Sequence, residues 1–252
     1  MPEEIKISAS IVTYNDADKA AAASASILAN CKKYPLCFYI VDNNSADDTV
    51  SRLEYQTSLK IIKLNKNIGF GAAHNKVIDL IESDYHFIIN PDITVNCDVF
   101  ADIVQYMEEN RDVVMLMPKI LSGDKTEQFL PKEVPNAKYL FLGRLSEKIR
   151  SQYVWQEKEI SAPAEIDFCS GCFFCIRTSA FKKLGGFDER FFLYLEDADL
   201  TLRAKNLGKV MFLPDVCVTH LWNRGSAKNI RLLLIHITSC FKFLFKWRNY
   251  KK

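Results

Sequence analysis

Short apolar runs alternate with helix-forming stretches through the first part of the chain. β-Branched and aromatic residues gather at residues 7–13, 37–41, 59–64 and 85–89, and a polar residue or cluster follows each run. Runs of this length and composition predict strands. An Ala-rich stretch after Asp16, a segment opened by Asp47 or Asp48, and residues 71–81 predict helices between them. The alternation predicts an α/β fold with a Rossmann-like, mostly parallel central sheet and helices on both faces.

The pattern weakens at about residue 122. Prolines interrupt the segment 122–163, which predicts an irregular insertion. Beyond it the pattern predicts a strand at 166–176, a short helix, a turn at 185–188, a helix at about 197–206, and two short strands at 210–213 and 216–219. The chain has no internal repeat and no Gly- or Ser-rich linker, so we expect one domain up to residue 227.

Polar residues follow three of the predicted strands directly. They are Tyr14 and Asn15 after the first, which ends in Thr13; Asp42, Asn43 and Asn44 after the second; and Asn90 and Asp92 after the fourth. In open α/β sheets the carboxyl ends of the strands border the crevice where ligands bind. We therefore expect these residues to gather along one edge of the sheet.

Composition is that of an ordinary folded protein. The 252 residues are 48% hydrophobic and 25% charged, with 9 Gly and 8 Pro, which excludes collagen, low-complexity disorder and a polytopic membrane protein. The chain contains 8 Cys, but its first residues lack the apolar stretch of a signal peptide, so we expect a reduced, cytoplasmic location. The longest apolar stretch, at residues 232–245, is too short and too polar to cross a bilayer.

The formal net charge is +2, but acidic and basic residues are distributed unevenly along the chain. No acidic residue follows Asp215, whereas basic residues recur to the C-terminus, so a mildly acidic body carries a basic end. Residues 228–252 combine the spacing of an amphipathic helix with this basic charge. Such a helix either lies on an anionic membrane or packs against the body or a dimer partner. A nucleic-acid partner is not expected, because the cations lie in one apolar tail.

Two groups of residues carry candidate chemistry. Asp92 at a strand end can hold a hard cation such as Mg²⁺ or Mn²⁺, and the alternative is an Asp that caps the next helix. His220, at another strand end, is either a metal ligand or a structural histidine. Glu196, Asp197 and Asp199 follow an apolar segment, where crowding favours general-base chemistry, but acids are also common in the first turn of a helix. In a helix, residues 196 and 199 share a face that excludes 197.

Other motifs have structural interpretations. Cys169, Cys172 and Cys175 lack a fourth cysteine at suitable spacing, and strand alternation would turn Cys172 away from the other two, so we expect buried apolar roles. The glycines at 69 and 71 do not make a dinucleotide fingerprint and instead predict a tight loop before a helix. His74 and His86 are expected to be structural.

Taken together, the motifs resemble the family 2 glycosyltransferases, inverting enzymes with a GT-A fold, and within them the bacterial rhamnosyltransferase-like branch. The resemblance covers roughly residues 5–222. Its matching residues are Ile11-Val12-Thr13-Tyr14-Asn15, Val41-Asp42-Asn43-Asn44-Ser45 with Asp48, Asn65 to Gly71 with Ala73 and Asn75, Asn90-Pro91-Asp92, and Gly185 to Glu189 through Phe192, Glu196-Asp197 and Asp199.

The resemblance implies roles for these positions. The donor nucleotide sugar would be bound by Thr13, Tyr14, Asn15, Asp42, Asn44, Asn67, Gly69, Asn75, Asn90 and Asp92. Asp92 would hold the divalent metal, Mg²⁺ or Mn²⁺, with His220, and Asp197 would be the base, supported by Glu196 and Asp199. Asn90 replaces the first acid of the family's Asp-x-Asp motif, so the metal has one anionic ligand fewer.

We therefore expect transfer of a sugar, L-rhamnose from dTDP-rhamnose or a hexose from a UDP-sugar, to a hydroxyl of a glycan or polyprenyl-linked acceptor in bacterial cell-surface polysaccharide synthesis. Residues 1–118 would bind the donor and 119–227 the acceptor, with the insertion on the acceptor side. The protein would be cytoplasmic or peripheral on the inner face of the plasma membrane, as a monomer or homodimer. The alternatives are a metal-dependent nucleotidyltransferase and a non-catalytic nucleotide-sugar-binding module.

Overall fold

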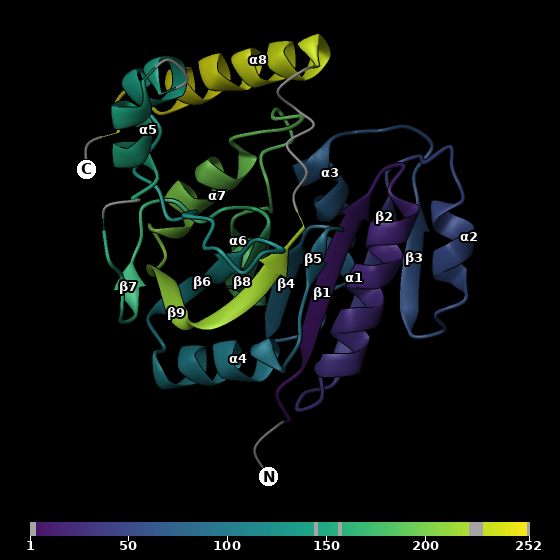
Figure 1. Cartoon of the computed structure of the whole chain (residues 1–252). Coiled ribbons are helices and arrows are strands. Elements are labelled where there is room, and N and C mark those ends of the chain that lie inside the picture. The colour runs from purple at the N-terminus through teal and green to yellow at the C-terminus, as the bar shows by residue number, and fades with distance from the viewer. Residues whose placement is uncertain (1–3, 144–145, 156–157, 222–228, 251–252) are drawn as a thin grey trace.

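A central β-sheet organises the molecule (Figure 1). The computed structural model describes residues 4–143, 146–155, 158–221 and 229–250. The described strands are β1 (Ile7–Thr13), β2 (Leu36–Asp42), β3 (Leu59–Lys63), β4 (Tyr85–Ile89), β5 (Ile93–Thr94), β6 (Val113–Leu121), β7 (Ala164–Glu165), β8 (Phe173–Arg177) and β9 (Lys209–His220).

The strand order is β3-β2-β1-β4-β8-β6-β9-β5, and β7 pairs with β9 beside this path. The four strands predicted in the first part of the chain pair in parallel, as do β6 and β9. β8 runs antiparallel between β4 and β6, and β5 and β7 are antiparallel to β9. The sheet is therefore mixed, and its longest pairings are parallel.

Helices cover both faces of this sheet (Figure 1). One face packs against α1 and α4, and the other against α3, η1, α6 and α7. The helices are α1 (Ala17–Asn30), α2 (Thr49–Glu54), α3 (Phe70–His74), α4 (Val99–Glu109), α5 (Glu147–Tyr153), α6 (Thr178–Lys183), α7 (Glu196–Ala204) and α8 (Ile230–Lys246), with a 3-10 helix η1 (Asn75–Leu80) and a π-helical turn η2 (Lys138–Leu142).

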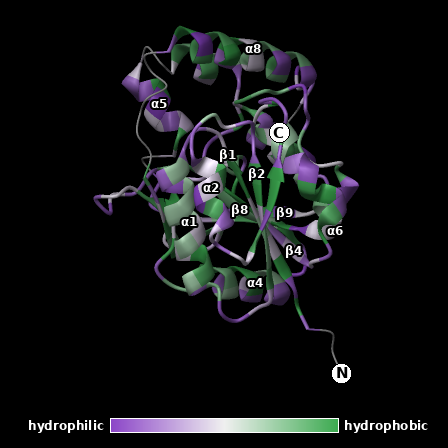
Figure 2. Ribbon diagram, turned by 90° about the vertical axis from the view of Figure 1, so that its right-hand side faces the viewer, coloured by the Kyte–Doolittle hydropathy of each residue, from purple (hydrophilic) through white to green (hydrophobic). Residues whose placement is uncertain are grey.

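Alternation along the strands builds two separate cores. In β2, Phe38 and Ile40 face the α1 and α4 side, whereas Tyr39 and Val41 face the other. Both sets are buried, so the strand reads as a continuous apolar run. Figure 2 shows the same arrangement, with hydrophobic residues concentrated in the central strands.

Several predicted elements have different bounds. The strand predicted at 166–176 begins only at Phe173, because Gly171 and Cys172 form a turn. The two strands predicted at 210–213 and 216–219 are one strand, β9, in which residues 214–216 bulge out of the pairing with β6. The helix predicted at 71–81 divides into α3 and η1.

Two regions contain structure that the sequence pattern did not indicate. The insertion predicted to be irregular contains η2 and α5. The segment between β4 and the insertion forms β5, α4 and β6, where hydrophobic positions on α4 are fully buried against the sheet. The three cysteines are buried as predicted, but Cys172 and Cys175 share one core and Cys169 lies in the other, since strand alternation does not extend through the turn.

The C-terminal helix α8 lies along one end of the molecule, beside α5 (Figures 1 and 2), and packs against α7. Cys240 and Phe243 on its inner face are buried in a third apolar cluster with Phe191, Leu195 and Ala198. The prediction of a helix in this tail is confirmed over residues 230–246, and residues 228, 251 and 252 lie outside those described. No described helix has the length and apolar character that crossing a membrane requires.

Candidate functional site

The polar residues at the strand ends lie together at one edge of the sheet. Thr13 at the end of β1 is in register with Asp42 at the end of β2, and Ile89 ends the adjacent β4. Asp42 is buried and accepts hydrogen bonds from the Ser45 amide at 3.2 and 3.3 Å. The Thr13 hydroxyl is buried without a hydrogen-bond partner among the described residues. A buried hydroxyl in this state can bind a ligand.

The loops after β1 and β2 are tied to each other beside this edge. Asn15 and Asn44 both have left-handed backbones, with φ of 52° and 70°. The side-chain oxygen of Asn15 accepts a hydrogen bond from the Ala46 amide at 2.7 Å. The ring of Tyr14 is 51% exposed next to these loops. Its aromatic face is therefore accessible to a ligand.

Asn67 and Gly69 shape the loop before α3. The side-chain oxygen of Asn67 accepts hydrogen bonds from Asn43 Nδ2 and from the Gly69 amide, both at 3.0 Å. Gly69 has a φ of 92°, and a Cβ there would lie 2.2 Å from the carbonyl oxygen of Phe192. Only glycine allows this approach, so the two chain segments meet here.

Asn75, also predicted to bind the donor, makes hydrogen bonds that hold a loop. Its side-chain oxygen accepts from the Phe187 amide at 2.8 Å, and its Nδ2 donates to the Phe187 carbonyl at 2.9 Å and to Glu189 at 3.1 Å. These contacts fix the turn at Gly185 and Gly186, which leads toward α7.

Asp92 and His220 face each other from neighbouring strands. Asp92 precedes β5, whose pairing with β9 sets Ile93 opposite His220, and Asp92 Oδ1 lies 3.1 Å from His220 Nε2. On the other side of the ring, His220 Nδ1 lies 3.0 Å from Gln128 Oε1, while Gln128 Nε2 donates to the His220 carbonyl at 3.0 Å. Because an amide oxygen only accepts, Nδ1 donates this hydrogen bond, and Nε2 is the ring nitrogen that could bind a metal.

This pair suits a hard divalent cation. Octahedral ligands at 2.0–2.1 Å from Mg²⁺ lie about 3 Å from one another, close to the distance between Asp92 Oδ1 and His220 Nε2. The described residues contain no group of three His, Cys, Asp or Glu side chains arranged for a metal. Two protein ligands are enough where substrate phosphates complete the coordination, which is how proteins commonly bind Mg²⁺.

Glu196 and Asp197 begin α7 after a sharp bend. Tyr194 and Leu195 both have left-handed backbones, with φ of 72° and 67°. Asp197 Oδ2 accepts a hydrogen bond from the Gly171 amide at 2.9 Å, and its Oδ1 accepts from the Ala198 amide at 2.8 Å. The turn at Gly171 lies where the sequence predicts the first part of a strand. Its backbone amide therefore donates to the Asp197 carboxylate.

Burial changes the acidity of both carboxyl groups. It raises the pKa of Glu196, and the neighbouring charge of Asp197 adds to that shift. Burial also raises the pKa of Asp197, while the cation of Lys132 and the Gly171 amide oppose the shift. Asp197 is thus a carboxylate with increased proton affinity that two neighbours keep available as an anion.

A cavity of about 530 Å³ joins these features. Asn90, Glu196, Asp197 and His220 line it, and so do apolar and aromatic side chains of η2, α5 and the loop before α7. Those side chains include Tyr139, Leu140, Tyr153, Leu193, Tyr194 and Leu195. The cavity therefore has polar groups at His220, which Asp92 contacts, and at Asp197, and its remainder is mainly apolar.

Lys132 is a site residue that the sequence pattern missed. It lines the cavity, and its ammonium group lies 4.5 Å from the centroid of the Phe168 ring. Burial lowers the pKa of Lys132, and the charge of Asp197 opposes that change. Lys132 lies in the proline-broken insertion, and Gln128 lies near its start, so no periodic pattern or motif marks either residue.

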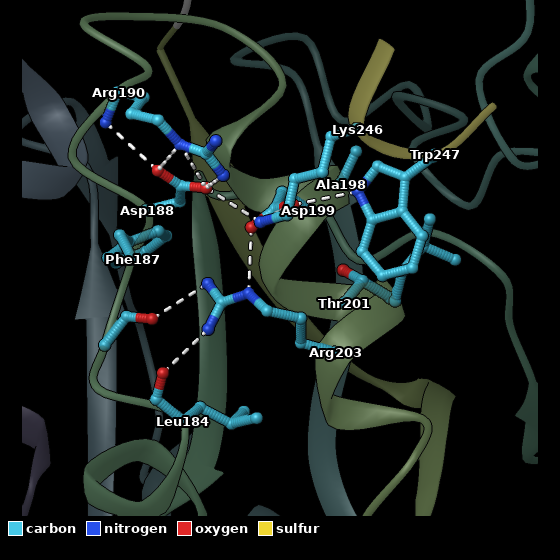
Figure 3. Close-up of polar contacts among 12 residues, drawn as sticks. Leu184, Phe187, Asp188, Arg190, Ala198, Asp199, Thr201, Arg203, Lys246 and Trp247 are labelled. Carbon is cyan, nitrogen blue, oxygen red and sulfur yellow. Dashed lines mark hydrogen bonds and ion pairs between the residues drawn. The ribbon is translucent and has the colours of Figure 1, made fainter. Parts of the chain in front are cut away.

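Asp199 lies away from this cavity. It is fully buried and accepts hydrogen bonds from Arg203 Nε at 2.8 Å and from Trp247 Nε1 at 2.8 Å, and Lys246 Nζ lies 2.5 Å away (Figure 3). Of the three acids at the start of α7, Glu196 and Asp197 line the cavity, and Asp199 faces α8. In a regular helix, residues 196 and 199 would share a face. That face does not determine which acids line the cavity, because Glu196 and Asp197 directly follow the left-handed bend.

Sequence comparison identifies the family. The model of the family described as "Glycosyl transferase family 2" matches residues 8–185. The rhamnosyltransferase WbbL of Escherichia coli is 24% identical over 71% of this chain and 71% of its own length. An N-acetylglucosaminyl-diphospho-decaprenol L-rhamnosyltransferase of Mycobacterium tuberculosis is 24% identical over 74% of this chain and 66% of its own length.

Structure comparison identifies the fold. The crystal structure of GalNAc-T7 with UDP, GalNAc and Mn²⁺ superposes with a TM-score of 0.72 at 13% identity, covering 99% of this chain and 49% of that one. This likeness confirms the predicted GT-A fold. The chain belongs to glycosyltransferase family 2 and is similar to rhamnosyltransferases.

Proposed function

We propose that the protein transfers a sugar, with inversion, from a nucleoside diphosphate donor to an acceptor hydroxyl in the cavity beside Asp197. The observation that carries this proposal is that Asp197 and His220 line one cavity, with Asp92 3.1 Å from His220. A base and a phosphate-binding centre at a common cavity are the two groups that a single displacement requires.

Asp197 is the base in this proposal. It removes the proton of the acceptor hydroxyl as that oxygen attacks the anomeric carbon from the face opposite the leaving group. Its raised proton affinity suits this task, and the Gly171 amide fixes the direction of one carboxylate oxygen. Glu196 supports the site as a buried neighbour, and Asp199 supports it through contacts behind α7.

Asp92 and His220 are the proposed metal ligands. Mg²⁺ or Mn²⁺ bound there would neutralise charge on the diphosphate of the leaving group. Gln128 orients His220 through both its ring and its carbonyl. Asn90, two positions before Asp92 in the same turn, provides a neutral side chain in place of a second acid.

The donor side is assigned to the strand ends. Thr13, Tyr14, Asn15, Asp42 and Asn44 would contact the nucleotide, whereas Asn67, Gly69 and Asn75 would shape that pocket through their internal contacts. The names of the two rhamnosyltransferase relatives favour L-rhamnose from dTDP-rhamnose, with a UDP-hexose as the alternative. Residues 1–118 would thus form the donor half of a domain that extends to residue 227.

The acceptor side is assigned to the remainder of the cavity. Its apolar walls suit a lipid-linked glycan, and the mycobacterial relative is named for a decaprenol-linked acceptor. The outer face of α8 exposes Phe241 and Phe245, at 62% and 72%, on a helix that contains basic and no acidic residues. We therefore extend the proposal to peripheral binding at an anionic membrane on the cytoplasmic side, in cell-surface polysaccharide synthesis.

A panel of nucleotide sugars tests this function. The protein is incubated with each donor, a polyprenyl-diphosphate-linked sugar and Mg²⁺ or Mn²⁺, and release of nucleoside diphosphate is measured. We expect release with dTDP-rhamnose or a UDP-hexose only when acceptor is present. Pyrophosphate release from a nucleoside triphosphate would instead favour a nucleotidyltransferase, and binding of every donor without turnover would favour a non-catalytic module.

Vesicle flotation tests the membrane part separately. Full-length protein is expected to float with anionic vesicles and not with neutral ones, and the double variant Phe241→Ser, Phe245→Ser is expected to stay at the bottom of the gradient. Equal flotation of the two proteins would remove this face of α8 from the proposal.

A further inference from the structure

The bend before α7 places a strained backbone directly beside the proposed base. Tyr194 and Leu195 are consecutive non-glycine residues in the left-handed region, which L-residues avoid. Such conformations persist only where the surrounding structure holds them, and they concentrate at functional sites. The groups that hold this bend therefore also determine where Asp197 lies.

α8 provides contacts to the bend. The Ser239 hydroxyl donates a hydrogen bond to the Leu193 carbonyl at 2.8 Å. The His236 ring packs edge-on against the Tyr194 ring, with 5.2 Å between centroids. Leu195 is buried in the same apolar cluster as Cys240 and Phe243. Side chains of one helix thus contact Leu193 and Tyr194 and share an apolar cluster with Leu195, immediately before Glu196.

α8 also supplies charge to the other side of α7. Asp199 is 0% exposed, and three donors surround its carboxylate: Arg203 from α7 itself, and Lys246 and Trp247 from α8 and the residue that follows it (Figure 3). A buried carboxylate is tolerated only when such partners compensate its lost hydration. Two of the three partners belong to the C-terminal helix.

Lys246 also binds the loop that leads to the bend. Lys246 Nζ lies 2.7 Å from Asp188 Oδ2, and Asp188 also binds Arg190 (Figure 3). Arg203 donates to the carbonyls of Leu184 and Gly186 at 3.0 and 2.8 Å. Residues 184–199 are therefore held on both sides of the bend, by α8 at Asp188, Leu193 and Asp199 and by Arg203 of α7 at Leu184 and Gly186.

We infer that α8 is a positioning element of the transfer site, in which Ser239, Lys246 and Trp247 hold the bend and α7 so that Asp197 points into the cavity. The inference rests on the proposed role of Asp197 as base. Its consequence is specific: loss of these contacts lowers the rate of the chemical step much more than it weakens nucleotide binding at the strand ends. The inner face of α8 positions α7 and the bend, and its outer face stays available for a membrane.

The decisive variants remove the donors with little change of shape. Lys246→Met removes the charge, Trp247→Phe removes the indole N–H, and Lys246→Arg keeps a cation. The double variant Lys246→Met, Trp247→Phe is expected to lose at least about tenfold in kcat with dTDP-rhamnose, because small displacements of a reacting group are costly. Its KM for the donor and its calorimetric Kd for dTDP with Mn²⁺ are expected to stay within about twofold.

Two matched controls accompany it. Arg248→Gln alters an exposed cation next to Trp247 that stacks on Phe245, and it is expected to leave kcat unchanged. Lys246→Arg is expected to recover most of the kcat lost in Lys246→Met. A general loss of packing would not be repaired by restoring charge alone.

The results separate this inference from the proposed function. If Asp197→Asn is inactive and the folded double variant has wild-type kcat, or loses dTDP binding in proportion to kcat, the positioning role is overturned. If Asp197→Asn is fully active, the proposed base fails instead. Should the double variant not fold, Ser239→Ala decides the question, because it removes one hydrogen bond to the bend and leaves every charge in place.

Discussion

The two ends of the cavity are constructed in different ways. The Asp92 end is formed by sheet register, since the short pairing of β5 with β9 sets Asp92 against His220. The Asp197 end is assembled from separate segments, namely the Gly171 turn, Lys132 in the insertion, and α8 behind α7. The first end depends on local pairing, whereas the second depends on tertiary packing. This difference predicts which substitutions act locally and which act at a distance.

The largest effect is expected for Asp197→Asn. The amide cannot accept the acceptor proton, so transfer should fall by at least about 10²-fold, the low end for a general base. Nucleotide binding should remain, because the strand ends that bind the donor are unchanged. Initial rates of transfer and calorimetry with dTDP and Mn²⁺ measure the two quantities.

Asp215→Asn is the matched control, since Asp215 is exposed on β9. It should behave as the wild type in both assays. A transfer rate near normal in Asp197→Asn would assign the base to another group.

Asp92→Ala should act at the other end of the cavity. It removes the single anionic ligand of the proposed cation site, so Mn²⁺-dependent binding of dTDP should weaken at least about tenfold. Binding measured in EDTA should be the same for variant and wild type. If the affinity for dTDP with Mn²⁺ is unchanged, the cation binds elsewhere. The two ends of the cavity would then not differ in the way described.

The same contrast explains what the sequence could predict. The parallel strands β1–β4 and the polar residues at their ends follow from local alternation, so Asp92 and Asp42 were found from one strand each. The start of α7 was also found, because acids mark a first turn. Helix geometry also predicts that Asp199 and Asp197 lie on different faces of this helix. No sequence pattern indicates the left-handed bend that sets Glu196 beside Asp197 at the cavity.

Long-range partners account for most of what sequence reasoning missed. Gln128 is 92 positions from His220, and Gly171 is 26 positions from Asp197. The Gly171 turn also delays the start of β8, which the apolar run alone predicts to be longer. The inward contacts of Lys246 with Asp188 and Asp199 were not foreseen, since the tail's charge pattern fits a membrane surface equally well.

Gln128→Leu should weaken Mn²⁺ binding by less than Asp92→Ala does. It removes both hydrogen bonds to His220 and so frees the ring to turn away from Asp92. Loss of such second-shell partners typically weakens metal affinity by about 10-fold or more, and we expect the lower limit here. Mn²⁺ titration monitored by electron paramagnetic resonance in the presence of dTDP measures it.

The control is Gln105→Leu, a glutamine on the exposed side of α4 that binds Glu109. If Gln128→Leu binds Mn²⁺ as tightly as this control does, the orientation of His220 is set by other contacts.

Lys132→Met should displace the pH dependence at the Asp197 end. The cation lowers the pKa of Asp197, so its removal lets burial raise that pKa further. A base must be ionised, and the rate falls as pH decreases through its pKa. The acid limb of kcat against pH should therefore move to higher pH, by about one unit for a neighbouring charge. An unshifted limb, with Lys138→Met as the exposed control, would show that Lys132 does not act on the base.

Glu196→Gln should have the smallest effect, visible in stability. Burial raises the pKa of Glu196 in the folded protein above its unfolded value, so the protonated form favours folding. The stability that this group contributes is complete below the ordinary Glu pKa and is lost as pH rises through the folded value. Between pH 5 and 9 the wild-type melting temperature should therefore fall relative to Glu196→Gln, by about 2–4 °C for each kcal/mol. Glu109→Gln, on the exposed side of α4, should keep a constant difference from the wild type across this range. If Glu196→Gln shows that same constant difference, Glu196 is already hydrated in the folded protein, and the base end of the cavity is wetter than its lining indicates.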